Sequence, residues 1–180
     1  TDITAGTING ESAIVKTFWQ NYYKAISRAN TILINLAENK ANLPQAVVDK
    51  YSAEARFVRA ANYAGLITHY GDVVYFTEIL DLDQAFSMAK TPKNEILNSI
   101  YDDYDFAYNN LPESYGSSGF TRATKGAAMA LKARIALYMG DWVIARDAAK
   151  AVIDLGLYTL HQDFAELFLS STKNSSESIF

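Results

Sequence analysis

The side chains that could perform catalysis are few and widely spaced in this sequence. His69 and His161 are the only histidines, and neither has the HxxxH or HxxE spacing that a metal or general-base site would use. Asp102, Asp103 and Asp105 form the one tight carboxylate group, yet paired carboxylates must face each other about 5–10 Å apart across a substrate. On a helix, Asp102 and Asp105 share a solvated face while Asp103 points elsewhere. With no nucleophile elbow, phosphate loop or dinucleotide motif, we expect a protein that is not an enzyme and has no cofactor or metal site.

Aromatic side chains are the other groups that could bind a ligand, because the chain has 12 Tyr, 9 Phe and 2 Trp. Trp19 and Trp142 lie on helical stripes, and we expect them in the core. Tyr75, Phe76 and Tyr115 lie in segments without a helical period, where a flat ring beside Asp, Asn or Ser can stack on a sugar or hold a peptide. These three are the candidate ligand-binding residues. The alternative for Tyr75 and Phe76 is that they pin their loop to the helices.

The composition excludes several classes of protein. A chain of 180 residues with 49% hydrophobic residues is long and apolar enough for one domain with a core, which argues against disorder. The net charge of −4 and the lack of a basic cluster argue against nucleic-acid binding. The absence of cysteine excludes disulfides and thiolate chemistry. These residues encode neither a signal peptide nor a membrane span, and the apolar Ile179 and Phe180 after a polar stretch suggest a piece of a longer chain.

Apolar residues recur with a helical period in five segments that proline and glycine delimit. The expected helices are 18–39, 44–70 closed by Gly71, 92–111, 121–139, and 141–155 ended by Gly156. Residues 72–90 and 112–120 have no such period and are expected to form an irregular insert and a loop. The sequence therefore predicts an all-α protein of antiparallel helix hairpins with little or no sheet.

The expected helix 121–139 is apolar on both faces, which is typical of an interior helix. After it, Ala133, Gly140, Trp142 and Ala145 have the spacing of half a tetratricopeptide repeat: a small residue, a turn glycine, an aromatic and an alanine. This spacing favours a stacked array of helix pairs.

Four ordered strings of the sequence resemble the signatures of the SusD/RagB family. They are WQNYYKAISRANTILINL (19–36), AEARFVRAANYAGLITHYGDV (53–73), DDYDFAYNNLP (102–112) and RATKGAAMALKARIALYMGDW (122–142), and the tail SSESIF is similar to the segment that follows. The matches cover most of the chain. Val74 stands where the family usually has proline, so the local shape of that loop is expected to differ.

The resemblance implies a fragment of a nutrient-capture lipoprotein of the Bacteroidota outer membrane. Its fold would be a right-handed array of tetratricopeptide-like helix pairs, with residues 1–180 as a single domain. Family members bind oligosaccharides, and some bind peptides, without catalysing a reaction. They cap a SusC-like TonB-dependent transporter and are held at the cell surface by a lipidated cysteine, which would lie outside these residues. The expected function is therefore carbohydrate binding in glycan uptake, and the alternative is a tetratricopeptide-like scaffold that binds a peptide or partner protein.

The residues shared with the family are expected to be scaffold rather than ligand contacts. Glu54, Arg56 and Arg59 lie close together on an otherwise apolar helix, so a buried arginine there needs a carboxylate or helix-end carbonyls. Asn30, among aliphatic residues, needs the same kind of partner. The expected scaffold residues are Trp19, Tyr23, Asn30, Glu54, Arg56, Arg59, Gly71, Asp72, Arg122, Lys125 and Gly126.

Arg122 and Lys125 stand at the expected start of the fourth helix. A helix N-terminus is electrostatically unfavourable for cations. We therefore expect them to serve another element, with Asp103 as an example of an acidic neighbour.

Overall fold

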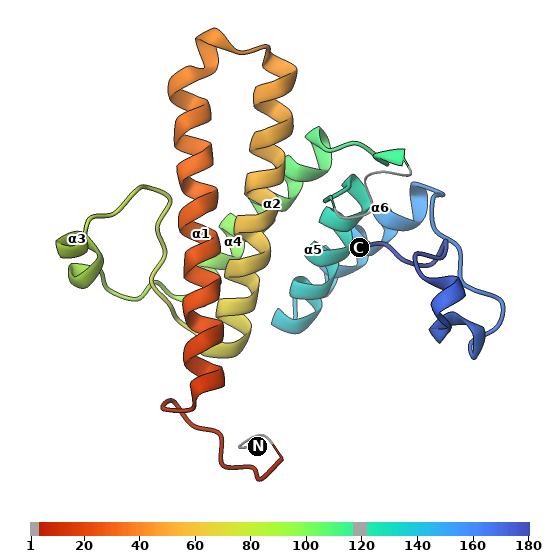
Figure 1. The fold of residues 1–180 in the computed structure, drawn as a ribbon, viewed down its shortest axis with the longest axis horizontal. Coiled ribbons are helices and arrows are strands. Elements are labelled where there is room, and N and C mark those ends of the chain that lie inside the picture. The colour runs from red at the N-terminus through yellow and green to blue at the C-terminus, as the bar shows by residue number, and fades with distance from the viewer. Residues whose placement is uncertain (1–3, 117–121) are drawn as a thin grey trace.

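The computed structural model of the protein describes residues 4–116 and 122–180, and it is built from α-helices joined by turns and irregular segments (Figure 1). The helices are α1 (Ala13–Asn39), α2 (Gln45–Tyr70), α3 (Leu82–Ser87), α4 (Lys93–Asn110), α5 (Lys125–Met139) and α6 (Trp142–Asp154). The described residues contain no β-strand and have one isolated antiparallel bridge, between Val73 and Thr91. The predicted all-α fold is confirmed.

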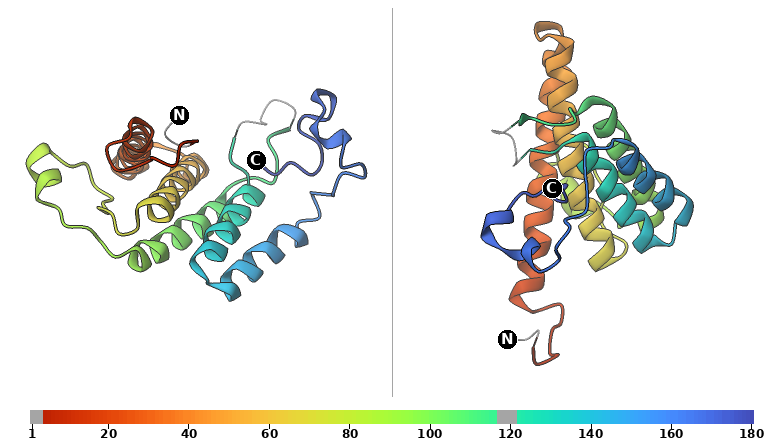
Figure 2. Two further views of the ribbon diagram at one scale, coloured as in Figure 1. Left: turned by 90° about the horizontal axis from the view of Figure 1, so that it is seen from below. Right: turned by 90° about the vertical axis from the view of Figure 1, so that its right-hand side faces the viewer.

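The long helices pack in the order of the sequence. A 3₁₀ turn, Lys40–Asn42, connects α1 to α2, and these two helices form the first hairpin. Helix α2 also packs against α4, α4 against α5, and α5 against α6, which forms the second hairpin. The segment between α2 and α4 projects on one flank of this stack and the C-terminal tail on the other (Figure 2).

The helix boundaries follow from local backbone chemistry. Pro44 and Pro92 are the N-cap residues of α2 and α4, with φ angles of −57° and −55° that the proline ring favours. Gly71 ends α2 with a φ of 72°, and its N–H donates to the carbonyl of Ile67. Helix α5 begins later than the sequence predicted, because the hydroxyl of Thr124 accepts the N–H of Ala127 at 3.2 Å and caps the helix there. The expected start at residue 121 lies outside the described residues.

The core lies along α2, which has neighbours on several sides. Its buried side chains include small alanines as well as large groups, and α1, α4 and α5 all pack against it. Helices α1 and α4 contribute large apolar groups to the same cluster, whereas α5 contributes mostly Gly and Ala in its first turns. The largest fully buried side chains are Tyr63, Tyr104, Ile26, Leu66, Ile67, Ile96, Ile100, Val73 and Asn30.

Two predictions about burial are wrong. Helix α5 is interior only in part: Gly126 to Met129 are buried, but Leu137 and Tyr138 near its end are 55% and 68% exposed. Trp142 is 66% exposed, because it is the first residue of α6 and lies at the edge of the hairpin. Trp19, in contrast, packs against the core as expected.

The insert between α2 and α4 contains one short helix that the periodicity did not indicate. Asp81 and Gln84 form a capping box around its first turn, with N–H to side-chain distances of 2.8 and 3.0 Å. Its Leu82 and Phe86 are 75% and 87% exposed, so α3 is held by its caps and connections rather than by the core.

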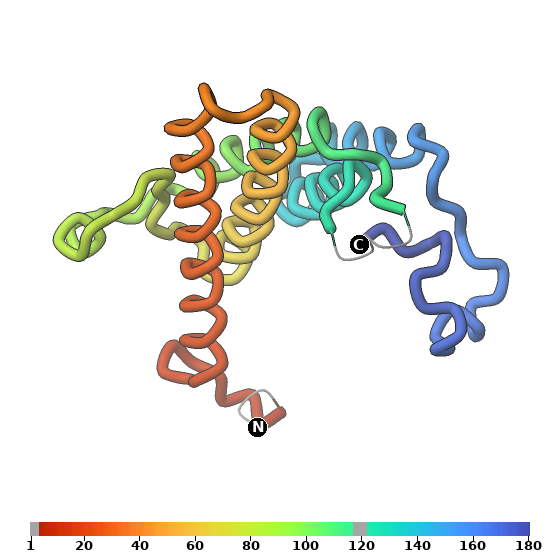
Figure 3. The backbone as a smooth tube through the Cα atoms, turned by 45° about the horizontal axis from the view of Figure 1, so that its top comes forward, coloured from red at the N-terminus to blue at the C-terminus, as the bar shows by residue number. Residues whose placement is uncertain are grey.

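The tail after α6 forms two 3₁₀ turns, Glu166–Phe168 and Ser170–Thr172, and then turns back toward the helices (Figure 3). The N–H of Thr159 donates to the carbonyl of Ser176 at 3.1 Å, and the ring of Phe180 lies edge-on to that of Phe57 at 5.3 Å. No helix in the described part of the chain combines the length and apolar character that crossing a membrane requires.

Candidate ligand-binding groove

A groove of about 570 Å³ runs between α1 and the insert. From α1 it is lined by side chains spaced four residues apart, which a helix places on one face. From the other side it is lined by the start of the insert and by α3. Its lining residues are Trp19, Gln20, Tyr23, Ser27, Thr31, Val74, Phe76, Glu78, Ile79, Leu80 and Ala85.

Three half-buried aromatic rings form a continuous surface in this groove, which we name the aromatic platform: Trp19, Tyr23 and Phe76. The rings of Tyr23 and Phe76 are almost parallel, at 8° and a centroid distance of 6.0 Å. Trp19 lies tilted against Tyr23 at 4.9 Å and edge-on to Tyr70 at 5.0 Å. Partly exposed flat rings beside hydroxyl, amide and carboxylate groups can stack on the apolar face of a sugar and bind its hydroxyls.

Tyr23 also fastens the insert to α1. Its hydroxyl donates to the carbonyl of Val74 at 2.9 Å. Burial raises the pKa of Tyr23 to about 12, so the hydroxyl stays protonated and able to donate through the neutral range. This bond holds the loop against α1 at Val74, the position where the related signature has proline, and the different loop shape stays a prediction.

Beneath the platform, a buried polar network connects three helices. The Arg59 guanidinium of α2 donates to both carboxylate oxygens of Asp103 of α4, from Nε at 2.7 Å and from Nη2 at 2.8 Å. Its Nη1 donates to Asn30 Oδ1 of α1 at 3.0 Å. Burial alone would lower the pKa of Arg59, but the hydrogen bonds and charge of Asp103 outweigh it, so the pKa is raised. The partners of Asp103 are thus Arg59 and, at 3.7 Å, Arg56, so Asp103 is the wrong example of an acidic neighbour for Arg122 or Lys125. Arg122 does serve another element as expected, because its guanidinium pairs with the Glu54 carboxylate of α2.

The structure separates the three candidate ligand residues. Phe76 lines the groove, but Tyr75 turns inward and packs on Tyr63 at a centroid distance of 4.8 Å. Tyr115 lies near the start of α5, where its hydroxyl donates to Glu54 at 2.9 Å and the Arg122 guanidinium covers its ring at 4.8 Å. That cluster borders a smaller depression of about 360 Å³, lined also by Thr124, Tyr158 and part of the tail.

The remaining family-motif residues have internal partners. The Arg56 guanidinium lies over the ring of Phe106 at 4.1 Å, and the ammonium of Lys125 lies 5.2 Å from the centre of Tyr108. Gly126 leaves room for the side chain of Tyr158, whose hydroxyl a Cβ at this position would meet. Asp72 accepts the backbone N–H of Lys93 at 2.9 Å and so joins the two ends of the insert.

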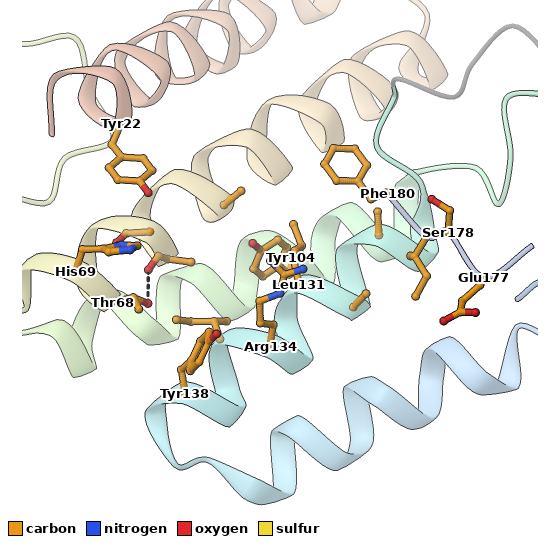
Figure 4. A pocket seen from close by; sticks show the side chains of 17 residues that line it. Tyr22, Thr68, His69, Tyr104, Leu131, Arg134, Tyr138, Glu177, Ser178 and Phe180 are labelled. Atoms are coloured by element: carbon orange, nitrogen blue, oxygen red, sulfur yellow. Dashed lines mark hydrogen bonds between the residues drawn. The ribbon is translucent and has the colours of Figure 1, made fainter. Parts of the chain in front are cut away.

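A larger hollow, of about 820 Å³, lies between α2 and α5 (Figure 4). Its walls carry small residues of the two helices, Tyr104 and Leu131 lie in its middle, and Phe180 and Glu177 of the tail enter it from one end. The His69 ring is bound to the carbonyl of Gly65 at 2.7 Å rather than to an acidic partner. The His69 ring also lies roughly parallel to that of Tyr22, at 28° and a centroid distance of 6.3 Å.

The groups considered for catalysis do not converge. His161 contacts the carbonyl of Asp163 at 2.9 Å in the tail. Asp105 binds Lys132 at 2.6 Å, Asp102 is exposed, and Asp103 is buried in the polar network. Within residues 4–116 and 122–180, no group of three His, Cys, Asp or Glu side chains could hold a metal ion.

The sequence reasoning missed the polar residues of the groove, Gln20, Ser27, Thr31 and Glu78. Ser27 and Thr31 continue the four-residue spacing of Trp19 and Tyr23, so their shared face was visible in the sequence. That this face borders the insert was not visible, because the hydrogen bond from Tyr23 to Val74 spans 51 residues.

Comparison with known proteins gives a consistent result. The family model described as SusD-like, "Starch-binding associating with outer membrane", matches residues 3–137. A SusD-like protein of Formosa agariphila is 28% identical over 166 residues, which are 92% of this chain and 31% of the relative. A SusD-like protein of Bacteroides ovatus is 25% identical over 174 residues, 89% of this chain and 31% of the relative. The chain thus spans about a third of the length of the curated relatives it matches.

Solved structures show the same fold. A SusD-like carbohydrate binding protein from Bacteroides fragilis is 27% identical with a TM-score of 0.84, over 94% of this chain and 33% of that one. A laminarin binding SusD-like protein is 27% identical with a TM-score of 0.83, over 91% and 36% of the two chains.

Proposed function

Since the chain belongs to the SusD-like family, we propose that it is the oligosaccharide-binding, non-catalytic component of an outer-membrane nutrient uptake system. The single observation that carries this proposal is the aromatic platform, with polar side chains on both sides of it. A laminarin binding relative with the same fold supports a glycan as the ligand.

Binding would use two kinds of contact. The C–H face of a sugar ring would lie on the partly exposed rings of Phe76 and Trp19, and its hydroxyls would bond to Gln20, Thr31 and Glu78. Glu78 is the one carboxylate among the residues that line the groove. Since glycoside hydrolysis needs two carboxyl groups on opposite sides of the bond, this groove would hold a glycan without cleaving it.

The proposed setting follows from the family. The protein would be lipid-anchored, exposed on the surface of the outer membrane, and partnered with a SusC-like TonB-dependent transporter that receives the glycan. Contacts that are exposed and must replace water give modest affinity, which suits a protein that must release its ligand. Tyr75 and Tyr115 remain predicted ligand contacts, but Tyr115 would act from the separate depression beside Glu54.

Calorimetric titration of the intact protein with laminari-, xylogluco- and malto-oligosaccharides tests the proposal. We expect Phe76→Ala to weaken binding of the preferred glycan about tenfold or more, because a stacked ring and its packing are lost. Phe86→Ala is the matched control: Phe86 belongs to the same insert but is 87% exposed on α3 and does not line the groove. The affinity of the Phe86→Ala variant for the glycan should stay within about twofold of that of the wild type.

Two results would count against the proposal. One is the absence of heat with every glycan, and the other is an equal effect of the Phe76 and Phe86 substitutions. Saturable binding in a parallel panel of peptides, with no glycan bound, would favour the tetratricopeptide-like scaffold instead.

A further inference from the structure

Phe76 is held by its backbone rather than by its ring alone. Its N–H donates to the hydroxyl of Tyr63 at 2.9 Å, and its carbonyl accepts from that same hydroxyl at 3.0 Å. The carbonyl also accepts from Asn30 Nδ2 at 3.0 Å. Side chains of two helices, α1 and α2, therefore satisfy both backbone groups of this one insert residue.

The orientation of the Asn30 amide is determined further inside the protein. Its Oδ1 accepts from Arg59 Nη1, which leaves Nδ2 to face the carbonyl of Phe76. Arg59 is itself held by two hydrogen bonds to Asp103. Asn30 is 0%, Asp103 5% and Arg59 9% exposed, so the bonds among these three side chains are shielded from water, and the bond to the Phe76 carbonyl is partly buried.

A buried ion pair is a poor way to gain stability, because well-packed apolar residues in its place are often neutral or better. Here the hydrogen bonds lead from α4 through α2 and α1 to a single residue, whose ring forms part of the aromatic platform. Such a series can hold a ring in its binding position before the ligand arrives, which lowers the entropic cost of binding.

We propose that Asn30 and Tyr63, with Arg59 and Asp103 behind them, are positioning residues that hold Phe76 ready for the glycan. We call this set the Phe76 clamp. The inference rests on the proposed function, and it adds a role for residues that do not themselves contact the ligand.

Tyr63→Phe in the intact protein is the sharpest test, because it removes the hydroxyl and keeps the ring against Tyr75. We expect glycan affinity to fall about tenfold and the Phe76 amide to exchange with solvent faster, since its N–H loses its acceptor. Tyr104→Phe is the matched control. Tyr104 is 1% exposed, like Tyr63, but it lies on α4 and lines the hollow between α2 and α5 rather than the groove. The Tyr104→Phe substitution should change neither the affinity for the glycan nor the rate of hydrogen exchange at the Phe76 amide.

A double-mutant cycle separates positioning from a general loss of structure. In a Phe76→Leu background, Tyr63→Phe should weaken binding no further, because the ring it positions is gone. A full additional loss in that background would overturn the proposal, and so would unchanged affinity in the single Tyr63→Phe variant.

The clamp and the proposed function fail in distinguishable ways. If the wild-type protein binds no glycan, the proposed function fails. If the Phe76 amide exchanges as fast in the wild type as in Tyr63→Phe, the clamp fails whatever the titrations show.

Discussion

Individual carboxylates on α4 have different environments although they are close in sequence. Asp103 is 5% exposed and accepts two hydrogen bonds from Arg59, whereas the side chain of Asp105 is 50% exposed and binds Lys132, whose side chain is 13% exposed. Removing one partner of a buried pair leaves the other charge uncompensated, and the low dielectric makes that costly. Exposed pairs, in contrast, are largely screened by water. Two aspartates of one helix thus contribute unequally to the stability of the protein.

We therefore expect Asp103→Asn to lower the free energy of unfolding by about 3–5 kcal/mol. Asp105→Asn, two positions away on the same helix, should cost about 1 kcal/mol or less. Urea unfolding followed by circular dichroism measures both. Similar losses in the two variants would show that the network around Arg59 does not carry the stability assigned to it.

At the scale of the elements, two glycines let helices end and the chain reverse. Gly140 closes α5 in the left-handed region, with φ 80° and ψ 14°, and directs the chain into α6. Gly71 ends α2 at φ 72° and ψ −128°, outside the region that side chains other than glycine visit. The second turn leads directly into the insert, so its shape bears on the groove as well as on stability.

Gly140→Ala should therefore destabilise the protein by about 1 kcal/mol, and Gly71→Ala by more, up to about 3 kcal/mol. Gly10→Ala serves as a control, because a Cβ there meets no atom within 4 Å and the φ angle is not in the strained range. Thermal unfolding at equal protein concentration gives the ranking. If Gly71→Ala is as stable as the control, the turn is not strained in the way described.

On the scale of the whole molecule, tyrosines packed between the helices make the stability of the protein fall at alkaline pH. Burial raises the pKa of Tyr23, Tyr101 and Tyr115 to about 12, and it raises the pKa of Tyr63 and Tyr104 as well. In the unfolded chain a tyrosine titrates near 10. The stabilising contribution is thus fully present below about pH 10 and is lost as the pH rises through 12, because the unfolded state releases its protons first.

The midpoint of urea unfolding should fall steeply between about pH 10 and 12. Tyrosinate absorbance recorded together with circular dichroism should show ionisation of these groups coinciding with loss of helix. Tyr23→Phe should make the dependence shallower, since one of the titrating groups is gone. A midpoint that stays constant over this range would contradict the linkage.

Local patterns in the sequence determined most of the elements. The helical period located the long helices, Pro44 and Pro92 marked two starts, and Gly71 marked an end, because helix formation and termination depend on neighbouring residues. The family motifs likewise indicated the stacked hairpins. The one short helix, α3, depends on the local capping box of Asp81, which no apolar period could reveal.

Tertiary structure decided which groups meet. It paired Asp103 with Arg59 across 44 residues instead of with Arg122, left Trp142 exposed, and separated Tyr115 from Phe76. Periodicity tells which face of a helix a side chain occupies but not which helix lies against that face. That choice depends on the packing of all the helices together, because a buried charge or backbone group takes whichever partner the packed core places within hydrogen-bond distance.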